Sequence, residues 1–518
     1  MNDIKILWID DEIDLLKVQI LFLEQKGYTV STANNAEDGF QLIKDNNFDI
    51  VFLDENMPGL SGLEILPIIK NYAASLPVIM VTKREEEEVM DDAVGSKVDG
   101  YLIKPVNPNQ ILLAIKQKVQ NKQLIGEKTV QKYQIEFRQL GNEINQANSF
   151  DEWVEIYKKI VYWELELEEA EKNQMMEIIS DQKLEANRNF CRFVENNYVE
   201  WIENEDIRPP MLFEMLRNRI LPMIKNKEKV FVIVIDNLRY DQWIMLKPTF
   251  KKYLNIETDD IITSILPTAT QYARNSFFAG LLPLDISKRY PQYWNDENDE
   301  GNKNDFEENL INEFFTRNRQ NIKITYHKIL NEDFANTKLK NVKALKDNNL
   351  NVFVFNFVDM LSHAKTNLQM VKDLAKDERA YRSLVHVWFK DSFLQYLLEE
   401  ISKLDVKVVL TTDHGSVWVK NAVKVIGDRE SSTNIRYKQG KNLTFNPKDV
   451  FAIKNPAKAG LPKSNLSTTY IFGVNQDYFV YPKNYHQFTK YYKETFQHGG
   501  VSLEEMLIPY VTFSSKNL

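Results

Sequence analysis

The stretch FVIVID at residues 231–236 is an apolar run that ends in a carboxylate, and two later stretches repeat this pattern. FNFVD ends at Asp359, with His363 four residues further on, and KVVLTTDH ends in Asp413 and His414. Such runs are typical of strands buried in a parallel α/β sheet, whose functional groups gather where the strands end. We therefore expect the three carboxylates and their histidines to share one polar cleft.

A fourth candidate ligand lies close to the C-terminus, in the stretch QHGG at residues 497–500, which contributes the imidazole of His498. Asp and His supply the oxygen and nitrogen ligands that zinc-like ions accept, and this mixed set suits zinc best, although manganese or cobalt would also fit. Asp359 and His363 are four residues apart, so on a helical turn both side chains would face one ion. The residues therefore predict a metal-dependent hydrolase.

Two threonines in the stretch LPTATQ, residues 266–271, are candidates for the nucleophile. Both Thr268 and Thr270 precede a predicted helix, whose free N–H groups and dipole favour an anion. A metal-coordinated hydroxyl there loses its proton more easily and becomes a nucleophile toward phosphorus. Two ions about 4 Å apart would stabilise the attacking and leaving oxygens of an in-line displacement. The residues alone leave both threonines open.

Three segments are expected along the 518 residues, a length that exceeds one hydrophobic core. Residues 1–119 alternate short apolar runs with amphipathic helices, as in a doubly wound parallel sheet. Residues 120–210 carry apolar residues at helical spacing among many Glu, Lys, Gln and Asn, which predicts a helical bundle or linker. Residues 211–518 alternate strands and helices around a second, larger α/β sheet. Within them, residues 295–305 are polar and predict a surface loop.

The composition limits the class of protein. Apolar residues make up 43% of the chain, which excludes global disorder, and the formal charge of −9 argues against a protein built mainly to coat duplex DNA. The single cysteine, Cys191, excludes an internal disulfide and fits a reducing compartment. We find neither a signal-peptide pattern nor an apolar run near the ~18 residues of a membrane span. A cytoplasmic protein is therefore expected.

Polar residues of the first segment also fall at the ends of predicted strands, where they are expected to meet in one pocket. They are Asp10, Asp11, Glu12, Asp54, Thr82 and Lys104. Crowded carboxylates need a cation, and Mg²⁺ with oxygen ligands suits them. A carboxylate beside Mg²⁺ can attack a phosphoryl group, with Thr82 and Lys104 binding the phosphoryl oxygens.

Together with the stretch NMPG at residues 56–59, with Tyr101 and with the Lys104-Pro105 pair, these residues resemble the receiver domain of two-component response regulators. The resemblance implies that Asp54 is the phosphorylation site and that a cognate sensor histidine kinase is a partner. It implies a receiver magnesium site made of Asp10, Asp11, Asp54 and Asn56. It also implies a switch set made of Thr82, Tyr101 and Lys104.

The candidate ligands of the third segment, in their order along the chain, resemble those of the alkaline phosphatase superfamily, and within it the PglZ domain. The resemblance implies a C-terminal alkaline-phosphatase-like α/β domain that holds two zinc ions. It implies one metal site made of Asp236, Thr270, Asp413 and His414. It implies a second metal site made of Asp359, His363 and His498. It also favours Thr270 over Thr268 as the catalytic nucleophile, and a threonine nucleophile in this superfamily favours a phosphodiesterase.

A receiver, a helical middle and a PglZ domain in one chain resemble the response regulators tied to type IX secretion. This resemblance predicts that phosphorylation of Asp54 alters dimerisation or domain packing and thereby controls a zinc-dependent phosphodiesterase. The partners would be the type IX secretion machinery or a sigma factor, and a homodimer is expected on phosphorylation. The alternative is a non-catalytic signalling adaptor whose phosphatase-like domain binds those partners. A DNA-binding output is disfavoured, because we find no helix-turn-helix or basic recognition helix.

A basic segment offers a second pair of alternatives. Residues 429–463 carry eight Lys or Arg against two acids, with Tyr437, Phe445 and Phe451 interleaved. Such a segment could hold a linear or cyclic oligonucleotide substrate by charge and base stacking. Equally, it could be a solvated insertion whose charge balances an acidic neighbour.

Several remaining polar residues have a structural interpretation beside a functional one. Arg239 and Arg274 could clamp a phosphate by paired hydrogen bonds or could form ordinary ion pairs. The acidic run Glu85–Glu88 is interpreted as solvated surface. Three histidines are assigned to ordinary packing or surface, namely His327, His386 and His486.

Overall fold

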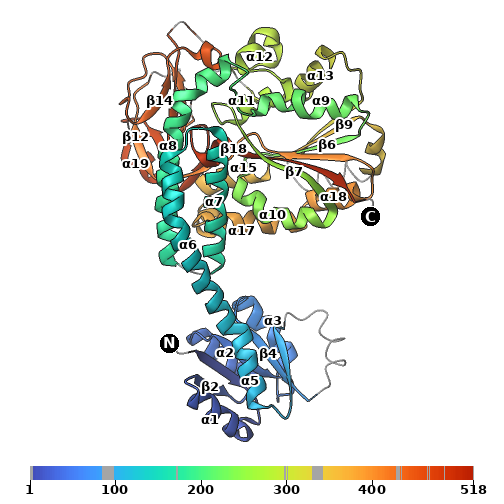
Figure 1. Ribbon diagram of the computed structural model, residues 1–518, viewed down its shortest axis with the longest axis vertical. Helices are drawn as coiled ribbons and strands as arrows, with labels where there is room; N and C mark the ends of the chain where they lie inside the picture. The colour runs from blue at the N-terminus through green and yellow to red at the C-terminus, as the bar shows by residue number, and fades with distance from the viewer. Residues whose placement is uncertain are drawn as a thin grey trace. The chain divides into compact units, whose positions relative to one another are not determined.

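The computed structural model divides the chain into two compact units, which are described separately (Figure 1). The first unit comprises Met1–Ile135 and Glu166–Met175, and the second comprises Glu136–Leu165 and Met176–Leu518. The residues that the structure describes are 4–83, 98–170, 173–296, 299, 301–329, 342–427, 432, 434–463, 465, 467–483 and 485–516. The acidic run Glu85–Glu88 lies outside the described residues.

The first unit contains a five-stranded parallel sheet in the order β2-β1-β3-β4-β5, which confirms the predicted doubly wound fold. The strands are β1 (Lys5–Ile9), β2 (Thr29–Ala33), β3 (Ile50–Asp54), β4 (Val78–Thr82) and β5 (Gly100–Ile103). The helices that connect or follow them are α1 (Lys17–Gln25), α2 (Ala36–Asp45), α3 (Gly62–Tyr72) and α5 (Pro108–Ile115). The central strands β3 and β4 are buried along their whole length. This burial explains why their residues are apolar except for the last of each strand, Asp54 and Thr82.

Three long helices form the predicted helical middle. They are α6 (Asn121–Gln146), α7 (Phe150–Glu169) and α8 (Asn173–Glu203). Within the second unit α7 and α8 pack through apolar faces, with the rings of Trp153 and Phe190 5.6 Å apart between centroids. Their buried residues belong to the same hydrophobic core as the strands of the large sheet. The middle helices of the second unit and the large sheet therefore share one core.

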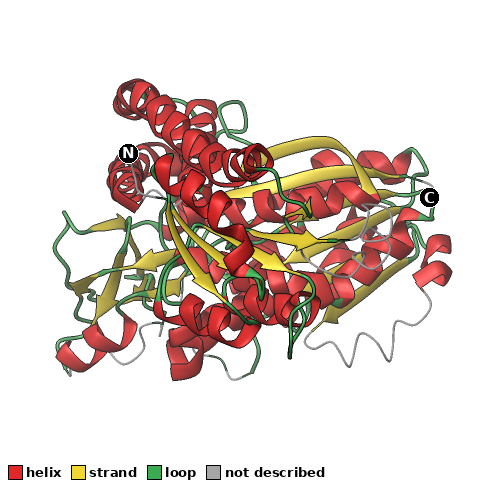
Figure 2. Ribbon diagram, turned by 90° about the horizontal axis from the view of Figure 1, so that it is seen from below, coloured by secondary structure: helices red, strands yellow, loops and turns green. Residues whose placement is uncertain are grey.

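The large sheet has six strands in the order β7-β18-β10-β6-β9-β8. Strands β10, β6, β9 and β8 are parallel, whereas β18 is antiparallel to both β10 and β7. Helices cover both faces, with α9, α11 and α13 on one side and α10, α17 and α18 on the other (Figures 1 and 2). This mixed sheet confirms the predicted C-terminal α/β domain. The strand bounds are β6 (Val230–Ile235), β7 (Leu254–Thr263), β8 (Ile324–Ile329), β9 (Leu350–Phe355), β10 (Lys407–Thr411) and β18 (Leu507–Ser515).

The helices of this domain connect the strands and carry part of the polar centre described below. They are α9 (Leu221–Lys225), α10 (Tyr240–Tyr253), α11 (Thr270–Ala279), α12 (Pro283–Arg289), α13 (Glu307–Arg317), α15 (Phe357–Asn367), α16 (Gln369–Leu374), α17 (Glu378–Asp391), α18 (Phe393–Ser402), α19 (Tyr485–Tyr492) and α20 (Leu503–Met506). Among the described residues, none of the helices combines the length and the apolar character that a membrane span requires.

Three small sheets are inserted between β10 and β18. They pair β11 with β17, β12 with β16, and β13 and β14 with β15. Their strands are β11 (Val417–Val419), β12 (Asn421–Lys424), β13 (Tyr437–Gly440), β14 (Val450–Ile453), β15 (Thr469–Gly473), β16 (Asp477–Val480) and β17 (Thr495–Gln497). This insertion includes the described part of the basic segment, and β17 leads directly into the QHGG turn.

Candidate metal centre

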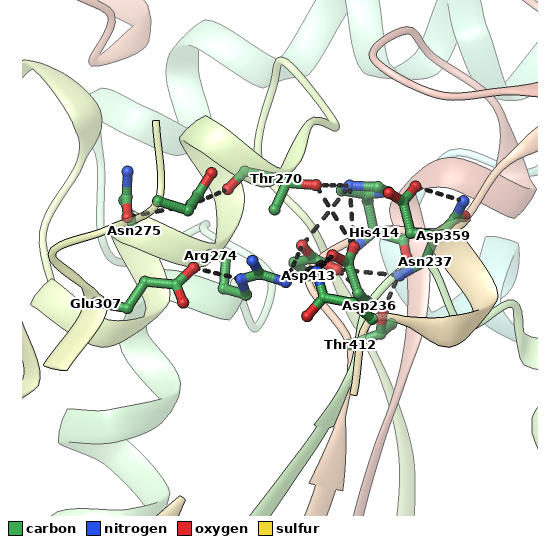
Figure 3. A network of polar contacts seen from close by, with 12 residues as sticks. Asp236, Asn237, Thr270, Arg274, Asn275, Glu307, Asp359, Thr412, Asp413 and His414 are labelled. Atoms are coloured by element: carbon green, nitrogen blue, oxygen red, sulfur yellow. Dashed lines mark hydrogen bonds and ion pairs between the residues drawn. The ribbon is translucent and has the colours of Figure 1, made fainter. Parts of the chain in front are cut away.

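Three of the predicted ligand segments lie at the ends of adjacent parallel strands. Strand β6 lies between β10 and β9, and Asp236 follows β6 while Asp413 and His414 follow β10. Asp359 lies in the first turn of α15, which follows β9, and His363 lies one turn later. Parallel strands present their carboxyl ends on one edge of a sheet, so the fold brings these segments together (Figure 3).

Asp236, Asp413 and His414 form the first ligand cluster, in which one potential ligand atom of each residue lies within 4.8 Å of the others. All three side chains are buried. Oδ2 of Asp413 has no hydrogen-bond partner among the described residues, and Nη1 of Arg274 lies 3.9 Å from it, beyond hydrogen-bond distance. A buried carboxylate oxygen without a donor is unfavourable unless a cation balances it. Two carboxylates and one imidazole are also ligands that zinc accepts, so this cluster fits a divalent cation.

Thr270 is the first residue of α11, and its hydroxyl oxygen lies 3.1 Å from Nε2 of His414 and 3.5 Å from Oδ1 of Asp236. The hydroxyl of Thr268 is used differently. It donates to the carbonyl oxygen of Gly500 at 2.8 Å and accepts from the N–H of Gly499 at 3.1 Å. Of the two threonines, Thr270 therefore presents its hydroxyl to the first ligand cluster.

Asp359, His363 and His498 form the second ligand cluster, again with potential ligand atoms within 4.8 Å of one another. Nε2 of His363 lies 3.4 Å from Oδ2 of Asp359, and Nε2 of His498 lies 3.5 Å from Oδ1 of the same residue. The side chain of His363 is 60% exposed, whereas those of Asp359 and His498 are largely buried. The second cluster is therefore open to solvent on the side of His363.

Asn237, which the sequence analysis missed, joins the two clusters. Its backbone N–H donates to Oδ1 of Asp413 at 3.2 Å, and its Nδ2 donates to Oδ1 of Asp359 at 3.3 Å. Its φ of 64° lies in the left-handed region, which asparagine tolerates better than most residues. The rings of His414 and His498 are stacked across the clusters, with centroids 4.2 Å apart. The two clusters are thus parts of one polar centre.

The charges of the centre are set by burial and by proximity. Burial, and then repulsion from Asp413, raises the pKa of Asp236. Burial also raises the pKa of Asp413. Burial alone would raise the pKa of Asp359, but the bond to His363 and the nearby His498 bring the pKa of this carboxyl below its ordinary value. A cation between Asp236 and Asp413 would remove the repulsion that their ionised forms experience.

The imidazoles differ in the same way. Burial and the neighbouring His414 lower the pKa of His498 to about 3, and burial lowers the pKa of His414. The bond to Asp359 raises the pKa of the more exposed His363. Two of the three rings are therefore neutral near pH 7, which is the form that ligates a metal.

Arg274 lies one turn after Thr270 on α11 and contacts the first cluster. Its Nη1 donates to Oδ2 of Asp236 at 2.6 Å, and its Nε donates to Glu307 at 2.5 Å. Tyr326 donates to the same Glu307. Burial opposes the charge, but Glu307 and Asp236 keep the pKa of Arg274 above its ordinary value. Arg274 therefore holds the side chain of Asp236 in place. Glu307, which bonds Arg274 in turn, was not identified as a residue of this centre from the sequence.

Arg239 does not act as a phosphate clamp in this structure, and the ion-pair interpretation holds for it. Its guanidinium is buried and pairs with Asp241 at 2.9 Å and with Glu378 at 2.8 Å. The polar stretch at residues 295–305 also departs from a simple surface loop. Its Asn304 donates from Nδ2 to the carbonyl oxygen of Thr270 at 3.1 Å, so part of this stretch contacts the start of α11.

The basic segment is less suited to an oligonucleotide than its composition predicts. Arg436 is fully buried and pairs with Glu505 at 2.5 Å, and Lys438 is buried with its ammonium donating to the carbonyl oxygen of Ser432. Tyr437 and Phe451 are buried as well, so neither ring is available to stack on a base, and Arg429 lies outside the described residues. These four residues therefore have structural roles, whereas Lys448, Lys454, Lys458 and Lys463 are exposed, so the oligonucleotide interpretation stays a prediction.

The remaining histidines occupy ordinary positions. His327 packs against Phe353, with ring centroids 5.1 Å apart, His386 lies on α17 and His486 on α19. Each lies outside the two ligand clusters.

The predicted receiver pocket is also assembled. Asp10, Asp11 and Asp54 place one carboxylate oxygen each within 4.8 Å of the others, and the ammonium of Lys104 lies 2.9 Å from Asp10 and 2.7 Å from Asp54. Burial raises the pKa of Asp54 despite its bond to Lys104. Three carboxylates around one point are a donor set that Mg²⁺ accepts.

The switch residues lie beside this pocket. Thr82 donates to Glu55, a residue that the sequence analysis did not single out. Asn56 is exposed after β3, and Tyr101 is half-buried against the apolar core of the sheet. The switch set of Thr82, Tyr101 and Lys104 stays a prediction.

Comparison with protein families gives three matches along the chain. Residues 6–116 match the response regulator receiver domain, and residues 123–202 match the PorX response regulator linker domain. Residues 215–513, more than half of the chain, match the BREX system PglZ alkaline phosphatase-like domain. The resemblances to a receiver and to a PglZ domain are confirmed, and the three matches together give a PorX-like architecture.

Individual relatives match the receiver region. The transcriptional regulatory protein ResD of Bacillus subtilis is 31% identical over 115 residues, which are 22% of this chain and 48% of ResD. The regulator AlgB of Pseudomonas syringae is 33% identical over 123 residues, which are 24% of this chain and 28% of AlgB. The chain thus spans less than half the length of these relatives. A solved receiver domain from Methanospirillum hungatei is 30% identical, with a TM-score of 0.22, and covers 23% of this chain and 96% of its own.

Proposed function

The chain belongs to the family of PglZ alkaline phosphatase-like domains, and from this premise we propose that it is a response regulator whose phosphorylation at Asp54 controls a zinc-dependent phosphodiesterase. Alkaline-phosphatase-like domains are metal-dependent, and receiver domains bind magnesium and imply a cognate kinase. We propose three further properties, namely the phosphodiesterase activity, zinc as the metal and Asp54 as the phosphorylation site.

One observation supports the proposal, namely that the hydroxyl of Thr270 lies beside the first of two ligand clusters that are joined into one polar centre. The clusters draw on strand ends that are distant in the chain, with 123 positions between Asp236 and Asp359 and 54 between Asp359 and Asp413, yet a bridging asparagine and a stacked histidine pair connect them. Burying carboxylates and neutral imidazoles together lowers the stability of the fold unless a bound cation balances them, so such a set is not expected for a purely structural reason. We therefore assign Asp236, Thr270, Asp413 and His414 to one zinc site and Asp359, His363 and His498 to the other.

The proposed chemistry starts at the Thr270 oxygen. Zinc ions bound at the two clusters would polarise the phosphodiester and favour the ionised hydroxyl. The Thr270 oxygen attacks phosphorus, so a bond from this oxygen to phosphorus forms while the bond to the leaving alcohol breaks. Water then attacks the phosphothreonine ester, releases the phosphomonoester and returns the Thr270 hydroxyl. Thr270 is the first residue of α11, so the helix dipole and the backbone N–H groups there would favour the negative charge that develops on the phosphoryl oxygens.

The proposed regulation starts in the receiver. Asp54 accepts a phosphoryl group from the cognate histidine kinase with Mg²⁺ held by Asp10, Asp11, Asp54 and Asn56. Lys104, which already bonds Asp54, would pair with the added phosphoryl oxygens, and Thr82 would exchange Glu55 for the same group. We propose that this change shifts the chain toward a homodimer.

We further propose that the pathway served is type IX secretion, with the secretion machinery or a sigma factor as partner. The support is the match of residues 123–202 to the PorX linker domain, in a chain that also carries a receiver and a PglZ domain in that order.

The test of the enzyme is hydrolysis of bis-p-nitrophenyl phosphate with zinc by the wild type, by Thr270→Val and by Thr316→Val. Thr316 is an exposed threonine of α13 and serves as the matched control. We expect Thr270→Val to lose about 10³-fold or more in rate, in the range seen when a catalytic group is removed, and Thr316→Val to match the wild type. Equal rates in all three proteins with zinc bound would leave the adaptor alternative, in which the domain binds partners without turnover.

A further inference from the structure

One face of the middle helix α8 is buried against the loops that carry the candidate metal centre. Lys183, Asn187, Cys191 and Tyr198 follow one another at spacings of four, four and seven residues, which places them in one stripe along the helix. All four side chains are buried. They are polar, so each needs a partner in the segment that covers it.

The first three residues of this stripe bind the segment that follows the QHGG turn. Cys191 donates from Sγ to the carbonyl oxygen of Val501 at 3.1 Å. Asn187 accepts at Oδ1 from the N–H of Leu503 at 2.7 Å and donates from Nδ2 to Glu504 at 2.9 Å. The ammonium of Lys183 lies 3.0 Å from Glu504. The short helix α20 is thus held on α8 by side chains more than 300 positions away.

The fourth residue of the stripe binds the segment that carries the two threonines. The hydroxyl oxygen of Tyr198 accepts from the N–H of Leu266 at 2.7 Å, four residues before Thr270. Burial raises the pKa of Tyr198, so its hydroxyl stays protonated at neutral pH and Leu266 has a neutral acceptor.

The two segments bound by α8 are also bonded to each other. Nδ1 of His498 lies 3.2 Å from the carbonyl oxygen of Thr268, whose hydroxyl bonds both glycines of the QHGG turn. The turn that carries His414 rests on the same support, because the N–H of Gly415 donates to the carbonyl oxygen of Glu505 at 3.2 Å. A Cβ atom at Gly415 would lie 2.0 Å from the carbonyl oxygen of Glu504, so this approach requires glycine.

We propose that α8 is a positioning element of the metal centre, in which Tyr198 and Asn187 fix the loops that present Thr270, His414 and His498. Neither residue touches the clusters, and both act through backbone groups of the loops. The expected loss of kcat when these residues are replaced rests on the proposed function, whereas the expected loss of metal affinity does not. The helix α8 is then part of the enzyme and not only a link to the receiver.

The test compares two tyrosines of the middle helices in the full-length protein. Tyr198→Phe removes the acceptor of the Leu266 N–H, whereas Tyr157→Phe removes a buried hydroxyl that has no hydrogen-bond partner among the described residues. We expect Tyr198→Phe to bind Zn²⁺ about tenfold more weakly in competition with a chromophoric chelator, as for other groups that orient metal ligands, and Tyr157→Phe to match the wild type. In hydrolysis, kcat should fall with KM unchanged, because the substrate contacts stay in place.

A second pair tests the other loop. Asn187→Ala removes both bonds to α20, whereas Asn189→Ala, on the same helix, removes bonds to α6 only. We expect the visible spectrum of bound Co²⁺ to change in Asn187→Ala and not in Asn189→Ala, since displacement of His498 alters the coordination geometry. Equal Zn²⁺ affinity within the tyrosine pair and equal Co²⁺ spectra within the asparagine pair would overturn the inference. A wild type that binds zinc but hydrolyses no phosphodiester would refute the proposed function. The Zn²⁺ affinities and Co²⁺ spectra of the variant pairs would then still decide whether α8 positions the metal ligands.

Discussion

The hydroxyl oxygen of Thr270 lies 3.1 Å from the Nε2 atom of His414. This is hydrogen-bond distance between two residues that are 144 positions apart and that belong to different segments, the start of α11 and the turn after β10. The neighbouring Thr268 bonds Gly499 and Gly500 instead. The two threonines therefore have separable roles, one at the clusters and one in the loop that supports them.

This separation gives the first prediction. Thr268→Val removes the partner of the Gly499 N–H in a fully buried loop, so we expect the free energy of unfolding to fall by about 1–3 kcal/mol. Thr270→Val should lower the rate of hydrolysis by about 10³-fold or more without a comparable loss of stability, and Thr270→Ser should retain hydrolysis because it keeps the hydroxyl. Chemical denaturation and the hydrolysis assay measure the two effects. A Thr268→Val protein of unchanged stability would show that its hydroxyl does not support the loop.

The bridging amides predict that the two clusters can be weakened one at a time. Asn237→Gly keeps the positive φ and the backbone bond to Asp413 but removes the Nδ2 bond to Asp359. Asn356→Ala removes the Nδ2 bond to Asp236, at 3.1 Å. We expect each variant to weaken one Zn²⁺ affinity by about 10-fold or more, at the second cluster for Asn237→Gly and at the first for Asn356→Ala. Metal titration with one-site variants, such as Asp413→Asn and His363→Ala, assigns each binding step to a cluster. Equal loss of affinity at both sites would show that the two clusters cannot be weakened separately.

The carboxylates of the metal centre follow a pattern that is visible in the sequence. Asp236, Asp359 and Asp413 were predicted to meet because each ends an apolar run, and runs of that kind form parallel strands with a common edge. Their neighbours were less predictable. Thr268 and Thr270 are equivalent in sequence, but Thr268 bonds a turn 232 positions away, whereas Thr270 contacts His414, 144 positions away.

The same limit explains the features that were misjudged or missed. Arg436 counts as a basic residue in any composition, but its pairing with Glu505 makes it part of the core. An asparagine after a strand, such as Asn237, is too common to indicate a bridge between metal sites. The polar stripe of α8 could not be recognised in the sequence, because its spacing is the one expected for any helix face that packs on another helix.

Removal of metal should destabilise the second unit. Asp236 and Asp413 are buried close together, and burial and their repulsion raise the pKa of Asp236, so the metal-free centre carries unfavourable electrostatics that a cation would relieve. Free zinc at 1,000 times its dissociation constant would stabilise the folded state by about 4 kcal/mol. Adding a chelator should therefore lower the thermal midpoint of the wild type, and much less that of Asp413→Asn. Identical shifts in the two proteins would place the stabilising metal elsewhere.

Phosphorylation predicts a change of oligomeric state. Lys104 bonds both Asp10 and Asp54 in the absence of a phosphoryl group, so a phosphoryl mimic on Asp54 must compete for this ammonium. We expect beryllofluoride with Mg²⁺ to move the wild type toward a dimer in size-exclusion chromatography. Asp54→Ala should not respond, and Asp49→Ala, which changes an acid outside the pocket, should respond as the wild type does. An unchanged elution profile of the wild type would remove dimerisation from the proposed regulation.

The ion pairs of the partly exposed Glu378 with two buried cations beside α8 predict a pH dependence of stability. Glu378 lies 2.8 Å from Arg239 and 3.5 Å from Lys183, and burial alone would raise its pKa, but these cations lower the pKa of its carboxyl below the ordinary value. A carboxyl with a depressed folded pKa adds stability above its unfolded pKa, about 4.3, and loses it as the pH falls through the folded pKa. Glu378→Gln should therefore be less stable than the wild type by about 3 kcal/mol at pH 7, with the difference shrinking steadily below about pH 4. Chemical denaturation at a series of pH values measures this difference, and Glu155→Gln, which breaks only the exposed pair with Lys158, should differ little from the wild type at any pH. A stability difference for Glu378→Gln that grows toward acid would mean that these cations do not hold the carboxylate in its charged form.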